Sequence, residues 1–491
     1  MAGHEPGGPR GERGDESHPM SLISPGEALP AGELGRVHFI AIGGAGMSGI
    51  ARIMLKRGMA VSGSDAADSE LLAQLGDLGA KVFVGHDAAY LGDADTVVVS
   101  TAIRDSNPEL VAARERGLRV LHRSAALASL MAGRRAVAVA GTHGKTTTTS
   151  MLTVALQHAG ADPSYCIGGQ LVTTGLGADE GRGEVFVAEA DESDGSFLMY
   201  SPWIAVITNV EADHLDNYGG FEKVKENFAR FVDRVEPGGT LVAGADDPVA
   251  MELAERGRER GLAVLTYGEA PGADLRVTGF TPRGLGSRFD LEGVGEVTLG
   301  VPGRHNALNA AAVVAVARAL GLDLGAVRDG LAGFQGAMRR LEPKGEAAGV
   351  EVFDSYAHHP TELTADLSAT RDYVEQKAGQ GGPSGRIVAV FQPHLYSRTR
   401  FFAAEFGAAL GLADVAVVLD VYGAREDPEP GVTGRLVADR VPEGTAWEYV
   451  PDQAEVAAAV VRLAVPGDVV ITLGAGDVTR LGPEILALLS R

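Results

Sequence analysis

The sequence predicts an α/β protein built from three domains. Its 491 residues are too many for one hydrophobic core, and at about 150 residues per domain they indicate three. Short apolar strands alternate with helices along almost the whole chain, and glycine-rich or polar loops follow the strands. The 67 glycines and 23 prolines fit the many tight turns of such a fold. We expect residues 33–134, 135–336 and 337–491 to form the three domains.

The composition excludes several classes of function. A formal charge of −22 argues against partners with an anionic backbone or surface, so neither nucleic acid nor a membrane is expected. No apolar run reaches the roughly 18 residues that a membrane helix needs. The single cysteine, Cys166, excludes an intrachain disulfide framework and fits a reducing cytoplasm. Residues 1–32 lack the apolar core of a secretory signal, and we expect a disordered extension there.

A nucleotide-binding turn is predicted at the start of the first domain. An apolar strand over residues 37–42 runs into a glycine loop and then a helix, and Gly44, Gly46 and Gly49 satisfy G-x-G-x-x-G. A second strand follows, and Asp65 beyond it lies where a carboxylate reaches ribose hydroxyls. NAD, FAD and a UDP-sugar all fit this pattern, and so does a glycine turn without a ligand. The candidate binding residues are Gly43, Gly44, Ala45, Gly46, Met47, Ser48 and Asp65.

The second domain opens with a phosphate-binding loop. A buried strand over residues 136–140 leads into a glycine loop and a helix, so backbone N–H groups and the Lys145 ammonium can hold phosphates while the Thr146 hydroxyl faces Mg²⁺. The match to G-x-x-x-x-G-K-[ST] is incomplete because Val139 stands at the first glycine, and a structural glycine turn is the alternative. The candidate residues are Gly141, Thr142, His143, Gly144, Lys145, Thr146 and Thr147.

Further polar groups follow the next strands of this sheet. Glu189 and His214 each come after a predicted strand, and the carboxyl ends of parallel strands share one edge. They are therefore expected to converge with Lys145 and Thr146 on a magnesium nucleotide. Asp191, Glu192 and Asp194 could join this site, but a solvated acidic loop is the favoured interpretation for each of them. Asn306 and Asn309 share one face of an Ala/Val-rich helix and are candidates for nucleotide contact, with a helix cap the alternative for Asn306.

The last domain resumes the alternation of strands and helices, again with polar clusters after strand ends. Arg398 and Arg400 suit a carboxylate or phosphate, and surface ion pairing is the alternative for each. His358 and His359 are adjacent in an extended segment, so their side chains point apart, which argues against their joining in one zinc site.

Together and in order, these motifs resemble the Mur ligase family. The resemblance spans nearly the whole chain from Arg36 onward. Its carriers are residues 43–49, 141–149, 189–194, 209–216, 305–309, 354–362, 392–400 and 474–477. The phosphate loop marks the wider family, whereas the first glycine loop with D-S-Y-A-H-H-P-T-E and Q-P-H-L-Y-S-R-T-R points to the ligase that adds the first amino acid. The implied fold has an N-terminal Rossmann-like UDP-binding domain, a central P-loop ATPase-type parallel sheet and a C-terminal Rossmann-like, amino-acid-binding domain.

The resemblance also implies roles for single residues. UDP would bind at Gly43 to Gly49 and ATP phosphates at Gly144, Lys145 and Thr146. One Mg²⁺ would bind Thr146 and Glu189, and a second His214. His358 and Arg398 would hold the L-alanine carboxylate, with Asn306 and Arg340 on the nucleotide side. The implied catalytic residues are Lys145, Glu189, His214, His358 and Arg398. Leu395 is a departure, since some members carry an arginine there.

The implied activity is an ATP-dependent ligation of L-alanine to the lactyl carboxylate of UDP-N-acetylmuramate through an acyl phosphate, for peptidoglycan synthesis in the cytoplasm. Small molecules would then be the only partners, with the chain a monomer or homodimer. A ligase that recycles a muramyl tripeptide has similar motifs and remains an alternative. Two others are a nicotinamide-dependent oxidoreductase, which leaves Lys145 unexplained, and a non-catalytic nucleotide-binding regulator.

Overall fold

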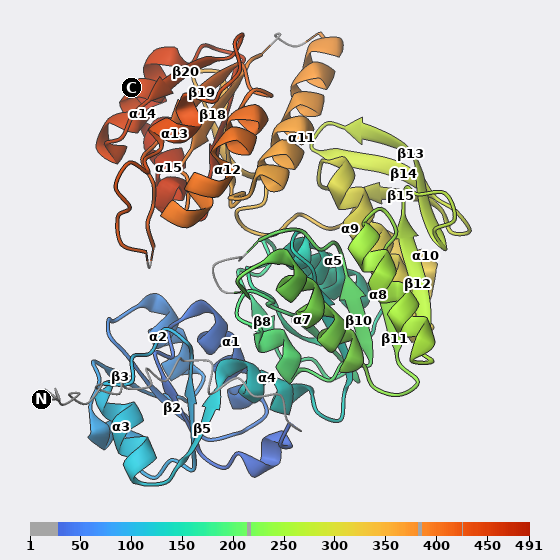
Figure 1. Ribbon diagram of the computed structural model, residues 1–491, viewed down its shortest axis with the longest axis vertical. Coiled ribbons are helices and arrows are strands. Elements are labelled where there is room, and N and C mark those ends of the chain that lie inside the picture. The colour runs from blue at the N-terminus through green and yellow to red at the C-terminus, as the bar shows by residue number, and fades with distance from the viewer. Residues whose placement is uncertain (1–27, 214–217, 382–384, 425) are drawn as a thin grey trace, which may run out of the picture.

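The computed structural model describes residues 28–213, 218–381, 385–424 and 426–491. Three sheets, each covered by helices, follow one another along the chain as the blue, green-to-yellow and orange-to-red parts of Figure 1. This confirms the predicted three-part α/β architecture. Residues 1–27 of the expected extension lie outside the described residues, and residues 28–32 pack partly against the first domain's core. No helix in the described ranges is both long and apolar enough to cross a membrane.

The first sheet is a small doubly wound sheet with the order β3-β2-β1-β4-β5, and all its pairs are parallel. The chain order reverses at β1, so the loop after β1 opens at the topological switch point, where such sheets bind ligands. The strands are β1 (Val37–Ile40), β2 (Val61–Asp65), β3 (Lys81–Val84), β4 (Thr96–Val99) and β5 (Arg119–His122), and the helices are α1 (Ala45–Lys56), α2 (Glu70–Asp77), α3 (Pro108–Glu115) and α4 (Arg123–Met131).

The central sheet has ten strands in the order β15-β14-β13-β12-β11-β10-β6-β9-β7-β8. Its core, β12 to β7, is parallel, as predicted, and chain order reverses at β6. The strands are β6 (Arg135–Ala140), β7 (Ser164–Cys166), β8 (Ala178–Asp179), β9 (Val185–Glu189), β10 (Ile204–Ile207), β11 (Thr240–Gly244), β12 (Ala263–Gly268), β13 (Leu275–Arg283), β14 (Gly286–Leu291) and β15 (Gly295–Leu299).

An antiparallel extension makes this sheet wider than the parallel sheet predicted. β13, β14 and β15 pair antiparallel, and β8 pairs antiparallel with β7. The first three are joined by short turns, which only antiparallel neighbours allow. The helices around the sheet are α5 (Lys145–His158), α7 (Phe221–Asp233), α8 (Pro248–Glu259), α9 (Arg304–Leu320) and α10 (Leu324–Ala332). The Ala/Val-rich α9 is buried along most of its length, which explains its lack of a polar face.

The third sheet has the order β16-β17-β21-β18-β19-β20 and is parallel except for β16. It brings the ends of β17, β21 and β18 side by side although the chain separates them widely. The strands are β16 (Glu342–Ala347), β17 (Val350–Ser355), β18 (Ile387–Phe391), β19 (Val415–Val418), β20 (Ala446–Tyr449) and β21 (Val469–Leu473). The helices are α11 (Pro360–Gly379), α12 (Tyr396–Leu410), α13 (Arg435–Ala438), α14 (Gln453–Leu463) and α15 (Leu481–Leu489).

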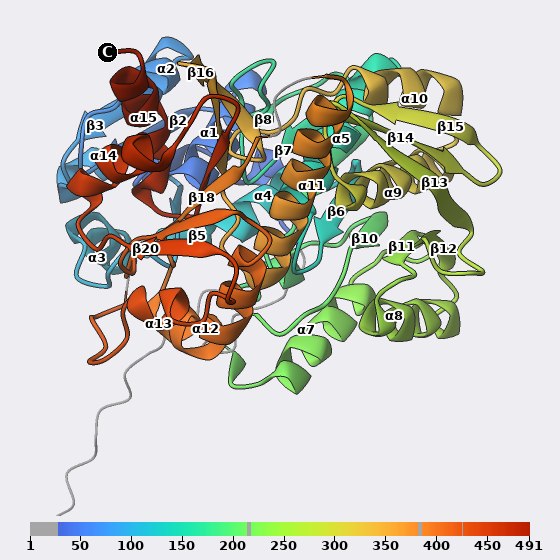
Figure 2. The ribbon, with the colours of Figure 1, turned by 90° about the horizontal axis from the view of Figure 1, so that it is seen from above.

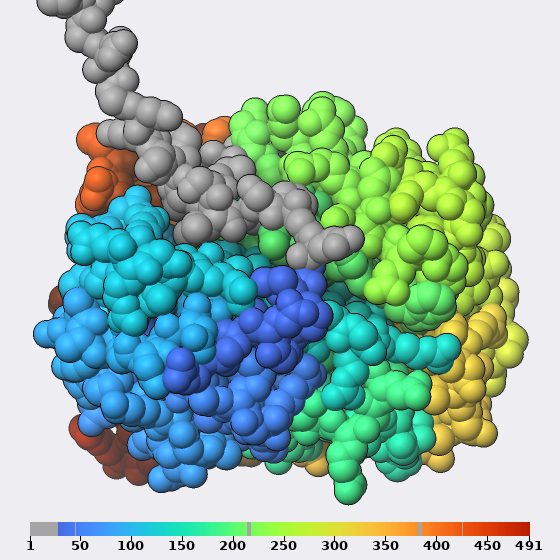
Figure 3. Space-filling model, turned by 90° about the horizontal axis from the view of Figure 1, so that it is seen from below, coloured from blue at the N-terminus to red at the C-terminus, as the bar shows by residue number. Residues whose placement is uncertain are grey.

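The three domains touch one another at defined places. One apolar cluster runs without a break from the first domain into the central domain, and Figure 3 shows these two parts packed together. Arg57 and Arg134 also share the Glu180 carboxylate at this boundary. The third domain meets the central domain through α11, which contacts α9 and β13 (Figure 2). The strand ends that carry the predicted site residues therefore face the boundaries between domains.

Candidate functional site

The loop after β6 is shaped to approach phosphate. β6 is buried and ends at Ala140, and the backbone then turns through Gly141 and Gly144, whose φ angles of 135° and 83° suit glycine. Gly144 caps the start of α5, and a Cβ on it would lie 2.7 Å from the Asn309 Oδ1 atom. Residues 141–147, here called the phosphate loop, thus place backbone N–H groups at a helix N-terminus without side chains in the way.

Lys145 lies beneath this loop in a buried ion pair. Its Nζ atom donates to Glu192 Oε1 at 2.8 Å and to the Gly141 carbonyl at 2.7 Å. Burial lowers the pKa of Lys145, but the Glu192 carboxylate outweighs burial and the pKa is raised. For Glu192 burial dominates and raises the pKa to about 7. The Lys145 ammonium is thus charged, and phosphate oxygens could compete with Glu192 for it.

The prediction of a solvated acidic loop was wrong for Glu192, whose exposed fraction is 3%. Glu192 belongs to residues 190–195, here called the acidic loop, and its carboxylate is buried against Lys145. Asp191 forms an ion pair with Arg123 at 3.2 Å. The acidic loop therefore lies between the first domain and the phosphate loop.

Thr146 and Glu189 come together as the sequence predicted. The Thr146 hydroxyl donates to Glu189 Oε1 at 3.0 Å, and the Gly168 N–H donates to Oε2 at 2.7 Å. These are a hydroxyl and a carboxylate, the oxygen donors that Mg²⁺ prefers. His214, the predicted ligand of a second ion, lies outside the described residues.

The phosphate loop is also tied to the chain after β10. Thr142 N–H donates to the Asn209 carbonyl, and the Thr142 hydroxyl accepts from Glu211 N–H at 2.8 Å. His143 contacts two carboxylates, with its Nε2 3.4 Å from Glu211 Oε2 and its Nδ1 3.4 Å from Glu362 Oε1. Burial lowers the pKa of His143, but the two carboxylates outweigh it and raise the pKa to about 9. Glu362 belongs to α11, so the loop reaches the third domain.

The start of α9 faces the phosphate loop, as the Gly144–Asn309 contact shows. Asn306 does not cap this helix, because the cap position is Gly303 and Asn306 lies inside the first turn. Its Nδ2 atom donates to the Pro302 carbonyl at 2.7 Å, and its Oδ1 atom accepts from Asn309 at 3.1 Å.

The two remaining candidates on the nucleotide side lie elsewhere. Arg340 lies 3.9 Å from Glu362 and over the Tyr356 ring. Thr147 follows in the first turn of α5 and is partly exposed.

The glycine loop of the first domain is held in place by Asp65. The Gly43 N–H donates to Asp65 Oδ2 at 2.9 Å, and Asp65 is the last residue of β2 rather than a residue beyond the strand. Gly44 caps α1, and Ala45, Gly46, Met47 and Ser48 form its first turn, with Met47 and Ser48 buried. The loop therefore presents a helix N-terminus beside a carboxylate, as the motif predicts.

Arg123 is a site residue that the sequence reasoning missed. It begins α4 directly after β5, and its Nη1 atom lies 3.2 Å from the position of a Cβ on Gly46. The same guanidinium pairs with Asp191 of the acidic loop. One cation thus links the glycine loop of the first domain to the central domain. The available signal was its position after a strand of the doubly wound sheet, a strand that had not been recognised.

In the third domain, His358 and Arg398 lie near the boundary with the central domain. Burial lowers the pKa of His358 to about 3, and its Nδ1 atom lies 3.0 Å from the Tyr356 carbonyl. Arg398 has an exposed fraction of 6% and donates to both oxygens of Asp213, at 2.9 and 3.2 Å. The alternative of a surface ion pair is therefore wrong for Arg398, which is buried. It is confirmed for Arg400, which pairs with Glu429 on the surface.

The site therefore combines a phosphate loop with a buried cation, a pair of oxygen donors, a second glycine loop and polar groups from a third domain. Such a site can hold a nucleoside triphosphate between two further ligands.

Comparison with known proteins agrees with this arrangement. Residues 36–135 match the Mur ligase family catalytic domain, residues 139–317 the Mur ligase middle domain, and residues 339–476 the Mur ligase glutamate ligase domain. The three matched ranges follow the three sheets in order.

Relatives match this chain over nearly its full length. A UDP-N-acetylmuramate–L-alanine ligase from Thermobifida fusca is 61% identical, covering 96% of this chain and 100% of its own. One from Kineococcus radiotolerans is 58% identical, covering 93% and 97%. The crystal structure of the UDP-N-acetylmuramate-alanine ligase MurC from Thermotoga maritima matches with a TM-score of 0.75 at 30% identity, covering 92% of this chain and 98% of that one. The chain belongs to the Mur ligase family.

Proposed function

We propose that this protein joins L-alanine to the lactyl carboxylate of UDP-N-acetylmuramate, using ATP, in peptidoglycan precursor synthesis. The observation that carries the proposal is 61% identity, over nearly the full length, to a relative with that activity in its name. The geometry supports it because one system of loops touches all three domains, through Arg123–Asp191 on one side and His143–Glu362 on the other. A nicotinamide-dependent oxidoreductase would give Lys145 no role, and the family of this chain is a ligase family.

The proposed chemistry uses the cations that the loops provide. The ATP phosphates lie on Gly144, Lys145 and Thr146, with Asn306 and Arg340 on the nucleotide side. The lactyl carboxylate attacks the γ-phosphorus, which forms an acyl phosphate and releases ADP. The L-alanine amine then attacks the acyl carbon, loses a proton, and inorganic phosphate leaves. Lys145 stabilises the charge on the transferring group, since phosphoryl transfer depends mainly on positioning and electrostatics.

Magnesium belongs to this proposal. The Thr146 hydroxyl and the Glu189 carboxylate would hold one ion, because they are adjacent oxygen donors and the Gly168 N–H already fixes the carboxylate. We assign a second ion to His214. A bound ion would neutralise charge on the phosphate oxygens.

The amino acid is proposed to bind in the third domain. His358 and Arg398 hold the L-alanine carboxylate there, and that carboxylate replaces Asp213 as the partner of the Arg398 guanidinium. The exchange is chemically balanced, because one carboxylate substitutes for another at the same cation.

The decisive experiment measures phosphate release from ATP with UDP-N-acetylmuramate and a series of amino acids. We expect release to require an amino acid, with L-alanine preferred over glycine, L-serine and D-glutamate. Equal release without any amino acid would defeat the ligase proposal and favour a nucleotide-binding role. The tripeptide L-Ala-D-Glu-diaminopimelate belongs in the same assay, since faster turnover with it would assign the chain to muramyl-peptide recycling.

We also propose domain boundaries at residues 32/33, 134/135 and 336/337, a cytoplasmic location, and a monomer or homodimer. Small-molecule substrates are the proposed partners. Native mass measurement tests the assembly, and cell fractionation tests the location.

A further inference from the structure

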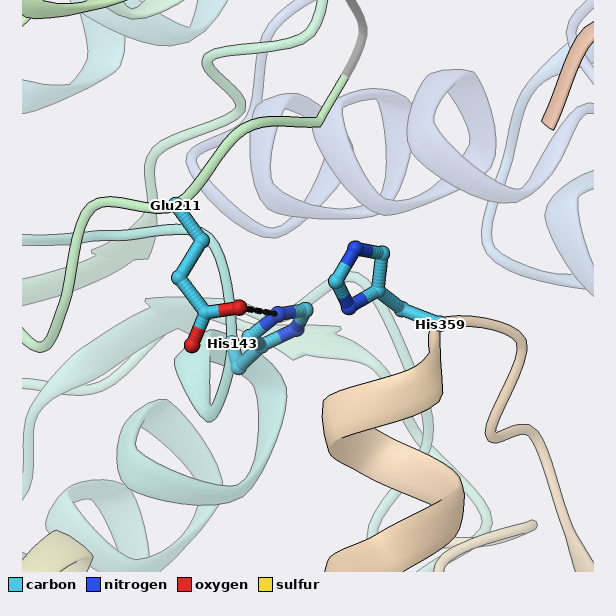
Figure 4. Close-up of side chains that lie close together, drawn as sticks. All are labelled: His143, Glu211 and His359. Carbon is cyan, nitrogen blue, oxygen red and sulfur yellow. Dashed lines mark ion pairs between the residues drawn. The ribbon is translucent and has the colours of Figure 1, made fainter. Parts of the chain in front are cut away.

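Three potential metal ligands from separate segments meet where the central domain faces the third domain. His143 comes from the phosphate loop, Glu211 from the chain after β10, and His359 from the residue before α11 (Figure 4). One ligand atom of each lies within 4.8 Å of the others. The two imidazole rings have centroids 4.6 Å apart. This cluster is separate from the oxygen pair of Thr146 and Glu189, and the proposed reaction does not use it.

Several nitrogens in the cluster are buried without a hydrogen bond. Among the described residues, neither ring nitrogen of His359 has a partner, and His143 Nε2 has none either, although Glu211 Oε2 is 3.4 Å away. The exposed fraction of His359 is 4%. A buried imidazole with no hydrogen-bond partner is well suited to bind a metal.

The residues around the cluster supply the outer contacts typical of metal sites. A ligand histidine usually donates its second N–H to a carboxylate, and Glu362 Oε1 lies 3.4 Å from His143 Nδ1. A ligand carboxylate is usually hydrogen-bonded in turn, and the Thr361 hydroxyl donates to Glu211 Oε2 at 2.7 Å. The side chain of Glu211 is 37% exposed, so an ion can reach the cluster from solvent.

We propose that His143, Glu211 and His359 form a binding site for one transition-metal ion of the Zn²⁺ type, bridging the central and third domains. Two imidazoles and one carboxylate favour Zn²⁺ over Mg²⁺, which prefers oxygen ligands. Tetrahedral Zn²⁺ with bonds of about 2.0–2.1 Å needs ligand atoms roughly 3.4 Å apart. The His143 Nε2 and Glu211 Oε2 atoms already have this separation, at 3.4 Å, so any approach needed when the ion binds falls mainly to His359.

The test measures metal binding directly on the full chain, without nucleotide and after removal of metals by a chelator. Zn²⁺ binding is followed by equilibrium dialysis and Co²⁺ binding by its visible spectrum, both in excess Mg²⁺ so that oxygen sites are filled. We expect one equivalent per chain. Glu211→Gln and His359→Gln should each weaken binding by at least about tenfold. His158→Gln, at an exposed histidine near the end of α5, is the matched control and should bind as the unmodified chain does.

A second readout separates a site from a folding defect. Zn²⁺ should raise the melting temperature of the unmodified chain and of His158→Gln, but not of the two ligand variants, whose melting temperatures without metal show whether they fold. Absence of binding at micromolar Zn²⁺, or binding that survives both ligand substitutions, would overturn the site. Neither result depends on ligase activity, so this proposal and the proposed function fail independently.

Discussion

The charge of Lys145 gives the sharpest prediction for a single residue. Lys145→Ala should lower turnover by on the order of 10²-fold or more, because it removes the cation that we propose faces the transferring phosphoryl group, and it also takes away the partner of Glu192. The measurement is phosphate release at saturating substrates. Lys223→Ala, at an exposed lysine on α7, is the control and should retain the normal rate. A near-normal rate in Lys145→Ala would show that the phosphate loop has been misread.

Residues could be predicted from the sequence where the signal is local. A strand, a glycine turn and a helix are continuous in the chain, so both glycine loops and the position of Lys145 could be recognised. Contacts between distant segments could be predicted only where both residues follow strands of one parallel sheet, as Thr146 and Glu189 do. Asp213 and Arg398 are 185 positions apart, and the burial of Glu192 depends on how its loop folds back. Arg123 carries no motif and becomes a candidate only beside Gly46.

Among the elements, α3 is held to its sheet by a buried carboxylate. Glu109 in its first turn contacts His38 Nε2 at 2.6 Å, Ser64 Oγ at 2.7 Å and His86 Nδ1 at 2.8 Å. Burial raises the pKa of Glu109, but these hydrogen bonds outweigh it and the pKa is lowered. A lowered carboxyl pKa contributes stability above the unfolded value of 4.5, and that stability is lost as the pH falls through the folded value.

Glu109→Gln should therefore lower the free energy of unfolding at pH 7 by about 1–3 kcal/mol, because it leaves buried partners poorly satisfied. The deficit should shrink as the pH falls below about 4.5, because the unfolded carboxyl then binds a proton, and it should stop shrinking once the pH has fallen through the lower pKa of the folded state. Urea unfolding at several pH values measures both effects. Glu115→Gln, exposed at the end of the same helix, should change little, and a constant deficit across the pH range would contradict the role of ionisation.

Sequence patterns predicted the parallel strands that lead into polar motifs, but they missed the antiparallel strands and also the parallel strands β5, β7, β11, β12 and β20. β6 and β10 are short runs of buried Val, Ile and Ala followed by polar residues, which is the pattern of a parallel strand. β13 to β15 alternate between buried and exposed residues at one edge of the sheet, and they carry no ligand motif that would have drawn attention to them.

At the scale of the whole molecule, polar contacts between described residues join the third domain to the central one. Arg398 bonds Asp213 across this boundary, Thr361 bonds Glu211, Glu362 contacts His143, and the Gly284 N–H donates to Gln376 of α11. We propose that the first of these gives way to the amino acid, so the closed arrangement depends on a contact that the substrate replaces. Domain closure and amino-acid binding are then coupled through one guanidinium.

Arg398→Ala should accordingly change both shape and amino-acid affinity. Without ligands, we expect small-angle scattering to show a larger radius of gyration than in the unmodified chain, because the buried ion pair to Asp213 is lost. In the phosphate-release assay the KM for L-alanine should rise at least about tenfold, since a charged hydrogen bond of roughly 1.5–3 kcal/mol is removed. Arg400→Ala, which breaks an outer ion pair on the same helix, should leave shape and KM unchanged. An unchanged KM in Arg398→Ala would show that Arg398 does not bind the amino acid and serves only to hold the two domains together.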